Sequence, residues 1–114
     1  MASFRTGAVV LIKFPFADGS GAKKRPALVL LDTNDHDLLL ARITTQSSAS
    51  PCDCELKNWS KAGLKAPSFV RLHKLATLEK KLVEKEFGSL TAADWRGVLE
   101  TWNEINRRLG AAIV

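Results

Sequence analysis

The chain has 114 residues, of which 46% are hydrophobic and 25% are charged, and its formal net charge is +5. This length suits one domain, expected over residues 1–114, and leaves no room for a second domain with an independent core, while the composition is too apolar for a disordered chain. Apolar runs such as residues 27–31 and 38–41 are far shorter than the roughly 20 residues of a membrane helix. No signal peptide is recognisable, so we expect a cytoplasmic protein without a membrane partner.

The positive charge is concentrated in one part of the chain. Between residues 57 and 85 there are eight Lys and Arg residues and two Glu residues, so this segment carries +6 and the remainder carries −1. A small domain with one strongly positive half attracts polyanions, of which nucleic acid is the most common. Charge alone also fits a surface that only keeps the protein soluble.

Four strands are predicted in the first half of the chain, because three short runs rich in apolar side chains and one run that alternates polar and apolar residues are bounded by turn residues. These runs are residues 8–16, 27–32, 38–45 and 52–56. The segment between the first two strands, residues 17–24, contains Gly19 and Gly21. We expect it to be a flexible, exposed loop.

The middle of the chain is less regular. Residues 57–63 can form one helical turn that stops at Gly63. The side chains of residues 68–75 alternate between two faces, neither of which is purely apolar. This pattern predicts a strand with one solvent-exposed face. Residues 77–83 are ambiguous, and we favour a strand there as well.

An amphipathic helix at the C-terminus is the clearest predicted element. Thr91 suits its N-cap, and Asp94, three residues later, suits the acid of a capping box. Gly110 suits the position just beyond the last helical residue. The apolar stripe recurs at helical spacing and consists of Trp95, Val98, Leu99, Trp102, Ile105 and Leu109. We expect its two tryptophans to supply much of the core area.

This order of elements predicts the fold class. Five or six short strands followed by one helix indicate a mainly β fold of the α+β class. Closely spaced turn signals between the strands favour a small barrel, with the helix covering an open end or one face.

The two cysteines do not predict a disulfide or a metal site. Cys52 and Cys54 are too close in sequence for an unstrained disulfide. Only His36 and His73 could complete a zinc site, and neither has a typical spacing. Both thiols are therefore interpreted as small buried side chains. Phosphate-binding and dinucleotide-binding loop motifs are also missing, so we expect no metal and no cofactor.

Two polar features could carry chemistry. The first is the basic tip Lys23-Lys24-Arg25, where Pro26 restricts Arg25 to an extended backbone. An arginine held beside a flexible loop can present its planar fork to a phosphate, although a charge at a strand end also discourages aggregation. The second is the hydroxyl-rich strand end at residues 43–48, which can bind a phosphate or a ribose, or can simply form a turn.

Taken together, these features resemble a known family. The segment GAVVLIKFPFADGSGAKKRPALVLL, then ITTQSS, the AGL turn, a basic strand and a helix ending in RRLG resemble the PemK/MazF-type growth inhibitors, the toxins of bacterial type II toxin–antitoxin pairs. The resemblance extends from Gly7 to Gly110. It implies a small SH3-like β-barrel of the CcdB/PemK type, a homodimer, and sequence-specific, metal-independent cleavage of single-stranded RNA that inhibits translation and growth.

The resemblance also implies roles for individual residues. The family's catalytic arginine and threonine fall on Arg25 and Thr44, and residues 19–24 correspond to a mobile loop that gates the RNA groove and the antitoxin site. Further RNA contacts are expected from Ser20, Lys23, Lys24, Thr45, Gln46, Ser68, Arg71 and His73. Some members carry an acidic residue where this chain has Ser68, and Arg71 or His73 could supply a polar group nearby.

The expected reaction uses the nucleophile that RNA carries, its 2′-OH, and leaves a 2′,3′-cyclic phosphate and a 5′-OH. Arg25 would stabilise charge on the phosphoryl oxygens and Thr44 would hydrogen-bond the phosphate or orient the 2′-OH. Solvent, His73 or another group would transfer the protons. Such toxins are neutralised by an antitoxin with an acidic, disordered tail, and the resulting complex is expected to bind DNA.

Two other functions are open at this point. One is a non-enzymatic inhibitor that binds a topoisomerase, as CcdB does, although the Trp-Gly-Ile terminus of that protein has no counterpart in the C-terminal sequence GAAIV. The other is an inactive family member that only binds RNA or antitoxin, which the replacement of the acidic residue by Ser68 would favour.

Overall fold

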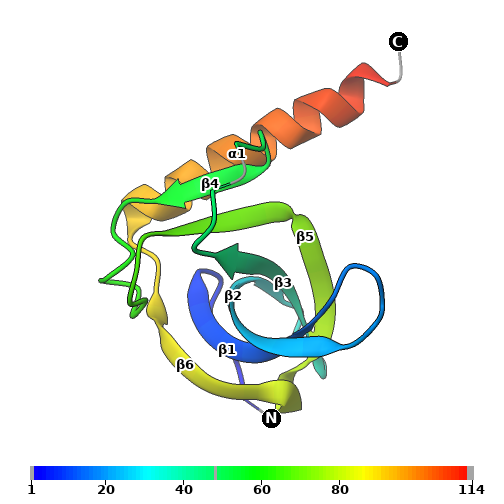
Figure 1. The fold of residues 1–114 in the computed structure, drawn as a ribbon, viewed down its shortest axis with the longest axis vertical. Coiled ribbons are helices and arrows are strands. Elements are labelled where there is room, and N and C mark those ends of the chain that lie inside the picture. Colours follow the sequence, from blue (N-terminus) through cyan, green and yellow to red (C-terminus); the bar gives the residue numbers. More distant parts are fainter. Residues whose placement is uncertain (1, 48, 113–114) are drawn as a thin grey trace.

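The computed structural model describes residues 2–47 and 49–112, which form one antiparallel sheet followed by one long helix (Figure 1). The sheet has six strands in the order β4-β5-β3-β2-β1-β6. The elements are β1 (Ala8–Pro15), β2 (Ala22–Asp32), β3 (Asp37–Thr44), β4 (Asp53–Leu56), β5 (Ser68–Glu79), β6 (Val83–Ser89) and α1 (Ala92–Ala111). The expected mainly β fold with a C-terminal helix is confirmed.

The sheet curls strongly but stays open. Figure 1 shows the strands curling around a common axis, with α1 running across one end. Register shifts in β1, β2 and β3 mark irregularities that increase local twist. The two edge strands are β4 and β6, which do not pair with each other in the described part of the chain. The architecture is thus a barrel-like sheet with an open seam.

Side chains alternate along each strand, and this alternation produces two cores on opposite faces of the sheet. One core lies between the sheet and α1 and includes Val9, Leu28, Ile43, Val70 and Val98. The other core lies on the opposite face and is formed by Ala8, Val10, Ile12, Phe14, Ala27, Val29, Leu38 and Leu40. Strands β1, β2 and β3 contribute to both cores, which explains why their sequences are almost continuously apolar.

The start of α1 has the expected cap but not the expected capping box. Thr91 Oγ1 accepts a hydrogen bond from the Asp94 N–H at 3.2 Å. The Asp94 carboxylate does not turn back toward Thr91. It instead accepts hydrogen bonds from the backbone N–H groups of Lys57, at 3.0 Å, and Asn58, at 2.8 Å. The buried carboxylate therefore ties the turn after β4 to the helix, a role that local sequence spacing does not reveal.

The far half of α1 differs from the prediction. Gly110 lies inside the helix, which ends at Ala111 and not before Gly110. Trp102 is 40% exposed and Leu109 is 64% exposed, so only part of the apolar stripe reaches the core and the second tryptophan does not fill it. Figure 1 shows the physical reason, since α1 extends beyond the sheet and its last turns have no strand beneath them.

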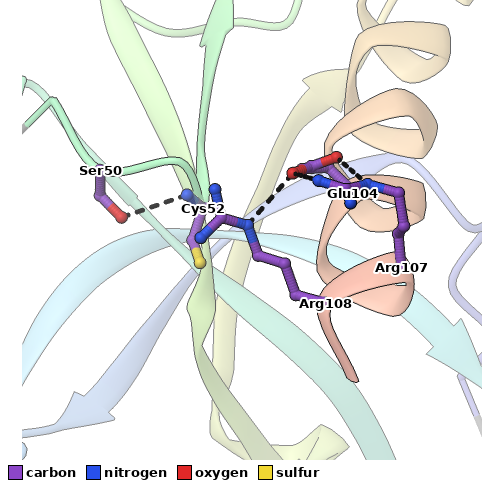
Figure 2. Close-up of polar contacts among 5 residues, drawn as sticks. All are labelled: Ser50, Cys52, Glu104, Arg107 and Arg108. Carbon is purple, nitrogen blue, oxygen red and sulfur yellow. Dashed lines mark hydrogen bonds and ion pairs between the residues drawn. The ribbon is translucent and has the colours of Figure 1, made fainter. Parts of the chain in front are cut away.

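Glu104 forms ion pairs with the two arginines near the end of α1 (Figure 2). Arg107 donates to both carboxylate oxygens, at 2.9 and 2.6 Å, and Arg108 donates to one of them at 3.1 Å. Hydrogen bonds from Arg107 and then from Arg108 lower the pKa of Glu104 to about 2. Much of the positive charge at this helix end is thus balanced locally.

Both thiols are free. Figure 2 also shows the turn into β4, where the Cys52 N–H donates to Ser50 Oγ at 3.1 Å. Cys54 is buried, as predicted, and a Cβ on Gly97 of α1 would lie 3.3 Å from its sulfur. Burial raises the pKa of the Cys54 thiol. Cys52 is only half-buried.

Two segments between the strands also differ from the prediction. The expected loop 17–24 is shorter, because β2 already begins at Ala22 and the Phe16 N–H donates to the Gly21 carbonyl at 2.8 Å. Residues 77–83 do not form one strand. Strand β5 ends at Glu79, a 3-10 turn covers Lys80–Leu82, and β6 follows. The turn buries Lys80, whose ammonium lies 2.9 Å from Asp32 Oδ1.

This ion pair predicts an acid-sensitive contribution to stability. Asp32 accepts hydrogen bonds from Lys80 and from the backbone N–H groups of Phe4 and Asn34, and these lower its pKa from 3.8 to about 2. Between pH 2 and 4 the unfolded chain therefore binds more protons at Asp32 than the folded protein does. The stability that this ion pair contributes is fully present above about pH 4 and is lost as the pH falls toward 2. The free energies of unfolding of the parent and of Asp32→Asn, measured in urea, should differ at pH 6 and become nearly equal near pH 2. An equal difference at both pH values would contradict this account.

Candidate nucleic-acid interface

A pocket of about 430 Å³ opens where the beginning of β2 lies beside the end of β3. The antiparallel pairing of these strands brings the basic tip and the hydroxyl-rich strand end to the same place. The lining residues are Lys23, Lys24, Arg25, Pro26, Arg42, Ile43, Thr44, Thr45, Gln46 and Ser68. The pocket is therefore bordered by cations and by hydroxyl and amide groups.

Arg25 and Thr44, the two residues expected to be catalytic, both line this pocket. The half-buried guanidinium of Arg25 lies 5.7 Å from the centroid of the Phe16 ring, a cation–π distance. Thr44 Oγ1 accepts a hydrogen bond from the Gln46 N–H at 3.2 Å. An oxygen that accepts in this way still has its own hydrogen to donate, for example to a phosphate oxygen.

The predicted RNA-binding residues divide into two groups. Lys23, Lys24, Thr45, Gln46 and Ser68 line the pocket, whereas Ser20, Arg71 and His73 do not. The ammonium of Lys24 forms an exposed ion pair with Glu84 at 2.8 Å. Ser68 is 2% exposed, and its hydroxyl donates to the Ala66 carbonyl at 2.8 Å. Ser68 thus occupies the predicted position but is already engaged with the backbone.

The three predicted residues outside the pocket have other surroundings. Ser20 lies in the β1–β2 turn, where its N–H donates to Asp18 Oδ1 at 2.9 Å. Arg71 Nε lies 3.3 Å from Asp53 Oδ1. His73 lines a second hollow, and burial followed by the charge of Arg71 lowers its pKa. Both effects favour the neutral form of its imidazole.

Two further hollows adjoin the pocket. The second, of about 330 Å³, shares Arg42 with it and is lined by Phe14, Pro15, Phe16, Ala17, His73, Lys74 and Leu75. The third, of about 400 Å³, shares Pro26, Thr45 and Ser68 with it and is also lined by Leu11, Gly63, Leu64, Lys65, Ala66, Lys85 and Phe87. Because each of these hollows shares lining residues with the pocket, we refer to the three together as the groove.

The basic segment 57–85 contributes to the groove only in part. Lys65 and Lys85 line the third hollow and Lys74 lines the second. By contrast, Lys80 is buried against Asp32, and Lys81 lies 3.3 Å from Glu79. The +6 segment is therefore not one continuous surface, which a charge count along the sequence cannot reveal.

Arg42 is an arginine of the groove that the sequence did not single out. It lines both the pocket and the second hollow, yet in the sequence it appears only as a polar interruption of the strand LLLARITT. The signal that points to it is period-two alternation, which places Arg42 on the same face of β3 as Thr44.

Among residues 2–47 and 49–112, no group of three or more His, Cys, Asp or Glu side chains could hold a metal ion. In the same part of the chain, no helix combines the length and apolar character that crossing a bilayer requires.

Comparison with known proteins places this geometry in a family. The family model described as "PemK-like, MazF-like toxin of type II toxin-antitoxin system" matches residues 5–106. No curated protein sequence matches the chain significantly.

Solved structures share the fold. An endoribonuclease from a mycobacterial species superimposes with a TM-score of 0.71 at 18% identity, over 89% of this chain and 88% of that one. A mycobacterial endoribonuclease in complex with its cognate antitoxin superimposes with a TM-score of 0.69 at 22% identity, over 88% of this chain and 90% of that one. A MazE–MazF structure from Deinococcus radiodurans superimposes with a TM-score of 0.70 at 17% identity, over 96% of this chain and 98% of that one. Since the family model covers nearly all of the curled sheet and most of α1, the chain belongs to the PemK-like, MazF-like toxins of type II toxin–antitoxin systems.

Proposed function

We propose that this toxin is an endoribonuclease that cuts single-stranded RNA in the groove. The observation that carries the proposal is that Arg25 and Thr44, which lie on different strands, line one open pocket together with Lys23, Lys24 and Arg42. Such a pocket suits a phosphodiester, because guanidinium and hydroxyl donors match its oxygens. The substrate is a cytoplasmic polymer, so the proposal also places the toxin in the cytoplasm.

The proposed reaction needs no external nucleophile. The 2′-oxygen attacks the adjacent phosphorus and loses its proton, while the bond from phosphorus to the 5′-oxygen breaks and that oxygen gains a proton. The products are a 2′,3′-cyclic phosphate and a 5′-OH. Arg25 stabilises the additional negative charge on the phosphoryl oxygens, and Thr44 donates a hydrogen bond that holds the phosphate in line.

Proton transfer is assigned to groups other than these two. A guanidinium stays protonated in proteins and a hydroxyl is a weak base, so neither Arg25 nor Thr44 accepts the 2′-OH proton. Ser68 replaces the acidic residue of some family members and cannot act as a carboxylate base. The candidate acceptors that we name are water and His73, whose imidazole lines the adjoining hollow and has a lowered pKa.

The same groove is the proposed antitoxin site. A cationic depression suits the acidic, disordered tail that family antitoxins carry, and such a tail would order as it binds. RNA and antitoxin then compete, which explains neutralisation without a second inhibitory site. A mycobacterial endoribonuclease and a MazF from Deinococcus radiodurans, both with this fold, have been solved with their antitoxins.

A homodimer is proposed through the apolar face beside α1. A hollow of about 230 Å³ there is lined by Leu30, Leu31, Leu39, Leu72, Trp95, Val98, Leu99 and Trp102. Leu31, Leu99 and Trp102 are 48%, 43% and 40% exposed, and a cluster of exposed large apolar side chains marks an interaction surface. A second copy of the chain would cover this face.

The dimer proposal predicts that Leu99→Glu gives a monomer, because a carboxylate would be buried in an apolar interface. Sedimentation velocity checks the mass, and Ala93→Glu, at an exposed position of the same helix away from the Leu99 side, is the matched control. A parent protein that sediments as a monomer, or a Leu99→Glu variant that remains dimeric, would contradict the assignment.

The proposed activity is tested with purified protein and a defined single-stranded RNA in EDTA, followed by analysis of the product ends. We expect cleavage, with 2′,3′-cyclic phosphate and 5′-OH termini. Products with 3′-OH and 5′-phosphate ends, or a requirement for metal, would contradict the mechanism. Binding of RNA without cleavage would instead identify an inactive member of the family.

A further inference from the structure

Arg42 is a cation of the groove that the proposed chemistry does not use. Its neighbours in β3, Ala41 and Ile43, are buried in the core beneath α1. Arg42 therefore projects from the opposite face, as Thr44 does. Its side chain lines the pocket that holds Arg25 and also the second hollow, so it stands at the boundary between the two.

Three arginines are neighbours in the sheet around this position. Arg42 lies directly across from Ala27 of β2 and from Arg71 of β5. Arg25 precedes Ala27 by two residues, so Arg25 and Arg42 are diagonal neighbours on adjacent strands, whose typical separation is roughly 7–8 Å. Arg71 has a carboxylate beside it, since its Nε lies 3.3 Å from Asp53 Oδ1.

Arg42 has no such compensation. Within the described residues, its buried Nε has no hydrogen-bond partner, and no carboxylate forms an ion pair with its guanidinium. Burial, followed by the positive charges of Arg25 and Arg71, lowers the pKa of Arg42. The group still remains protonated at neutral pH. A buried, uncompensated donor among like charges is unfavourable in the free protein, and a bound anion relieves that cost.

We propose that Arg42 binds a second phosphate of the RNA, the one adjacent to the scissile phosphate at Arg25. This inference rests on the proposed function and extends it by assigning a substrate-binding residue. The diagonal placement of the two arginines matches consecutive phosphates of an extended strand. The ring of Phe16 lines the second hollow, where the following base can stack on it. An acidic peptide needs no such aromatic surface, and for this reason RNA is the occupant that we assign.

The test uses a fluorescent single-stranded RNA that carries 2′-O-methyl groups throughout, so that it cannot be cut. Arg42→Met preserves most of the side-chain volume without the charge. Arg42→Lys keeps the charge but lacks the planar guanidinium that can form two parallel hydrogen bonds to a phosphate. We expect Arg42→Met to raise the Kd on the order of 10- to 100-fold and to reduce the salt dependence of binding by about one phosphate contact. Arg42→Lys should recover part of the loss. Arg96→Met, at an exposed position of α1, should bind as the parent does.

Two further measurements separate binding from a packing role. The free Arg42→Met protein should melt at a higher temperature than the parent, because the unpaired buried donor is gone. On cleavable RNA, the variant should raise KM more than it lowers kcat. A variant that melts lower and binds RNA with unchanged affinity and salt dependence would show that Arg42 only packs.

The outcomes distinguish this inference from the proposed function. Because the probe cannot be cut, loss of binding in Arg42→Met supports the role of Arg42 even if the parent does not cleave RNA. Cleavage by the parent with unchanged binding by Arg42→Met overturns the inference alone. If Arg42→Met loses affinity for a poly-glutamate peptide but not for the RNA, the inference is also overturned. A parent protein that binds no oligonucleotide overturns both proposals.

Discussion

Arg25→Ala is expected to reduce RNA cleavage on the order of 100- to 1,000-fold, the usual effect of removing one preorganised donor from a developing oxyanion. The guanidinium lines the pocket beside Thr44, and among the described cations it is the one that the reaction as proposed assigns to the scissile phosphate. The loss should fall mainly on kcat, because the stabilised charge appears only in the transition state. Initial rates on a defined RNA, with the product ends analysed, measure the effect.

The fold should survive this change. Arg25 is half-buried and its guanidinium lies over the Phe16 ring, so its removal should cost about 0.5–1 kcal/mol of unfolding free energy. Arg96→Ala is the matched control, since Arg96 is an exposed arginine of α1 outside the groove. If Arg25→Ala cuts RNA as fast as the parent, the assigned role of Arg25 is wrong.

Gly63→Ala is expected to cause the largest loss of stability. Gly63 has a backbone φ of +85°, and a Cβ there would lie 2.4 Å from the carbonyl oxygen of Phe87 and 2.8 Å from its carbonyl carbon. The left-handed conformation costs a residue with a side chain roughly 1–2 kcal/mol, and forcing an atom into packed backbone adds about 1–3 kcal/mol. We therefore expect a loss of about 2–5 kcal/mol in urea unfolding.

Gly110→Ala provides the matched control for the same substitution. A Cβ at Gly110 would meet nothing within 4 Å, and the residue lies within α1. Alanine there should stabilise the protein by about 0.5–1 kcal/mol, because it favours the helical conformation. A Gly63→Ala variant as stable as the parent would contradict the close approach of the AGL turn to β6.

The sequence predicted features that depend on short-range patterns. The strands at residues 8–16, 27–32 and 38–45 were recognisable because apolar runs end at turn residues, and Thr91 was recognisable because a cap acts within three residues. The meeting of Arg25 with Thr44 followed from the resemblance to a family, and the pairing of β2 with β3 places both at one pocket.

Features set by distant contacts were not predictable in this way. The Asp94 carboxylate suited a local capping box, but its partners are the backbone groups of Lys57 and Asn58, which are distant in sequence. Lys80 counted as surface charge, although it is buried against Asp32. Arg42 lacked a motif, and only the position of its neighbours across the sheet makes it a member of the groove.

The central claim is that the groove uses the ribose of the substrate as the nucleophile, with Arg25 stabilising the charge that results. The most direct measurement replaces one ribose of a cleavable RNA with deoxyribose, at the nucleotide whose 2′-OH would attack, and compares the rates of cutting. We expect this single change to abolish cleavage at that bond while binding is retained. Cleavage of the deoxy-substituted strand at the parent rate would contradict the account, because the attacking oxygen would then come from elsewhere.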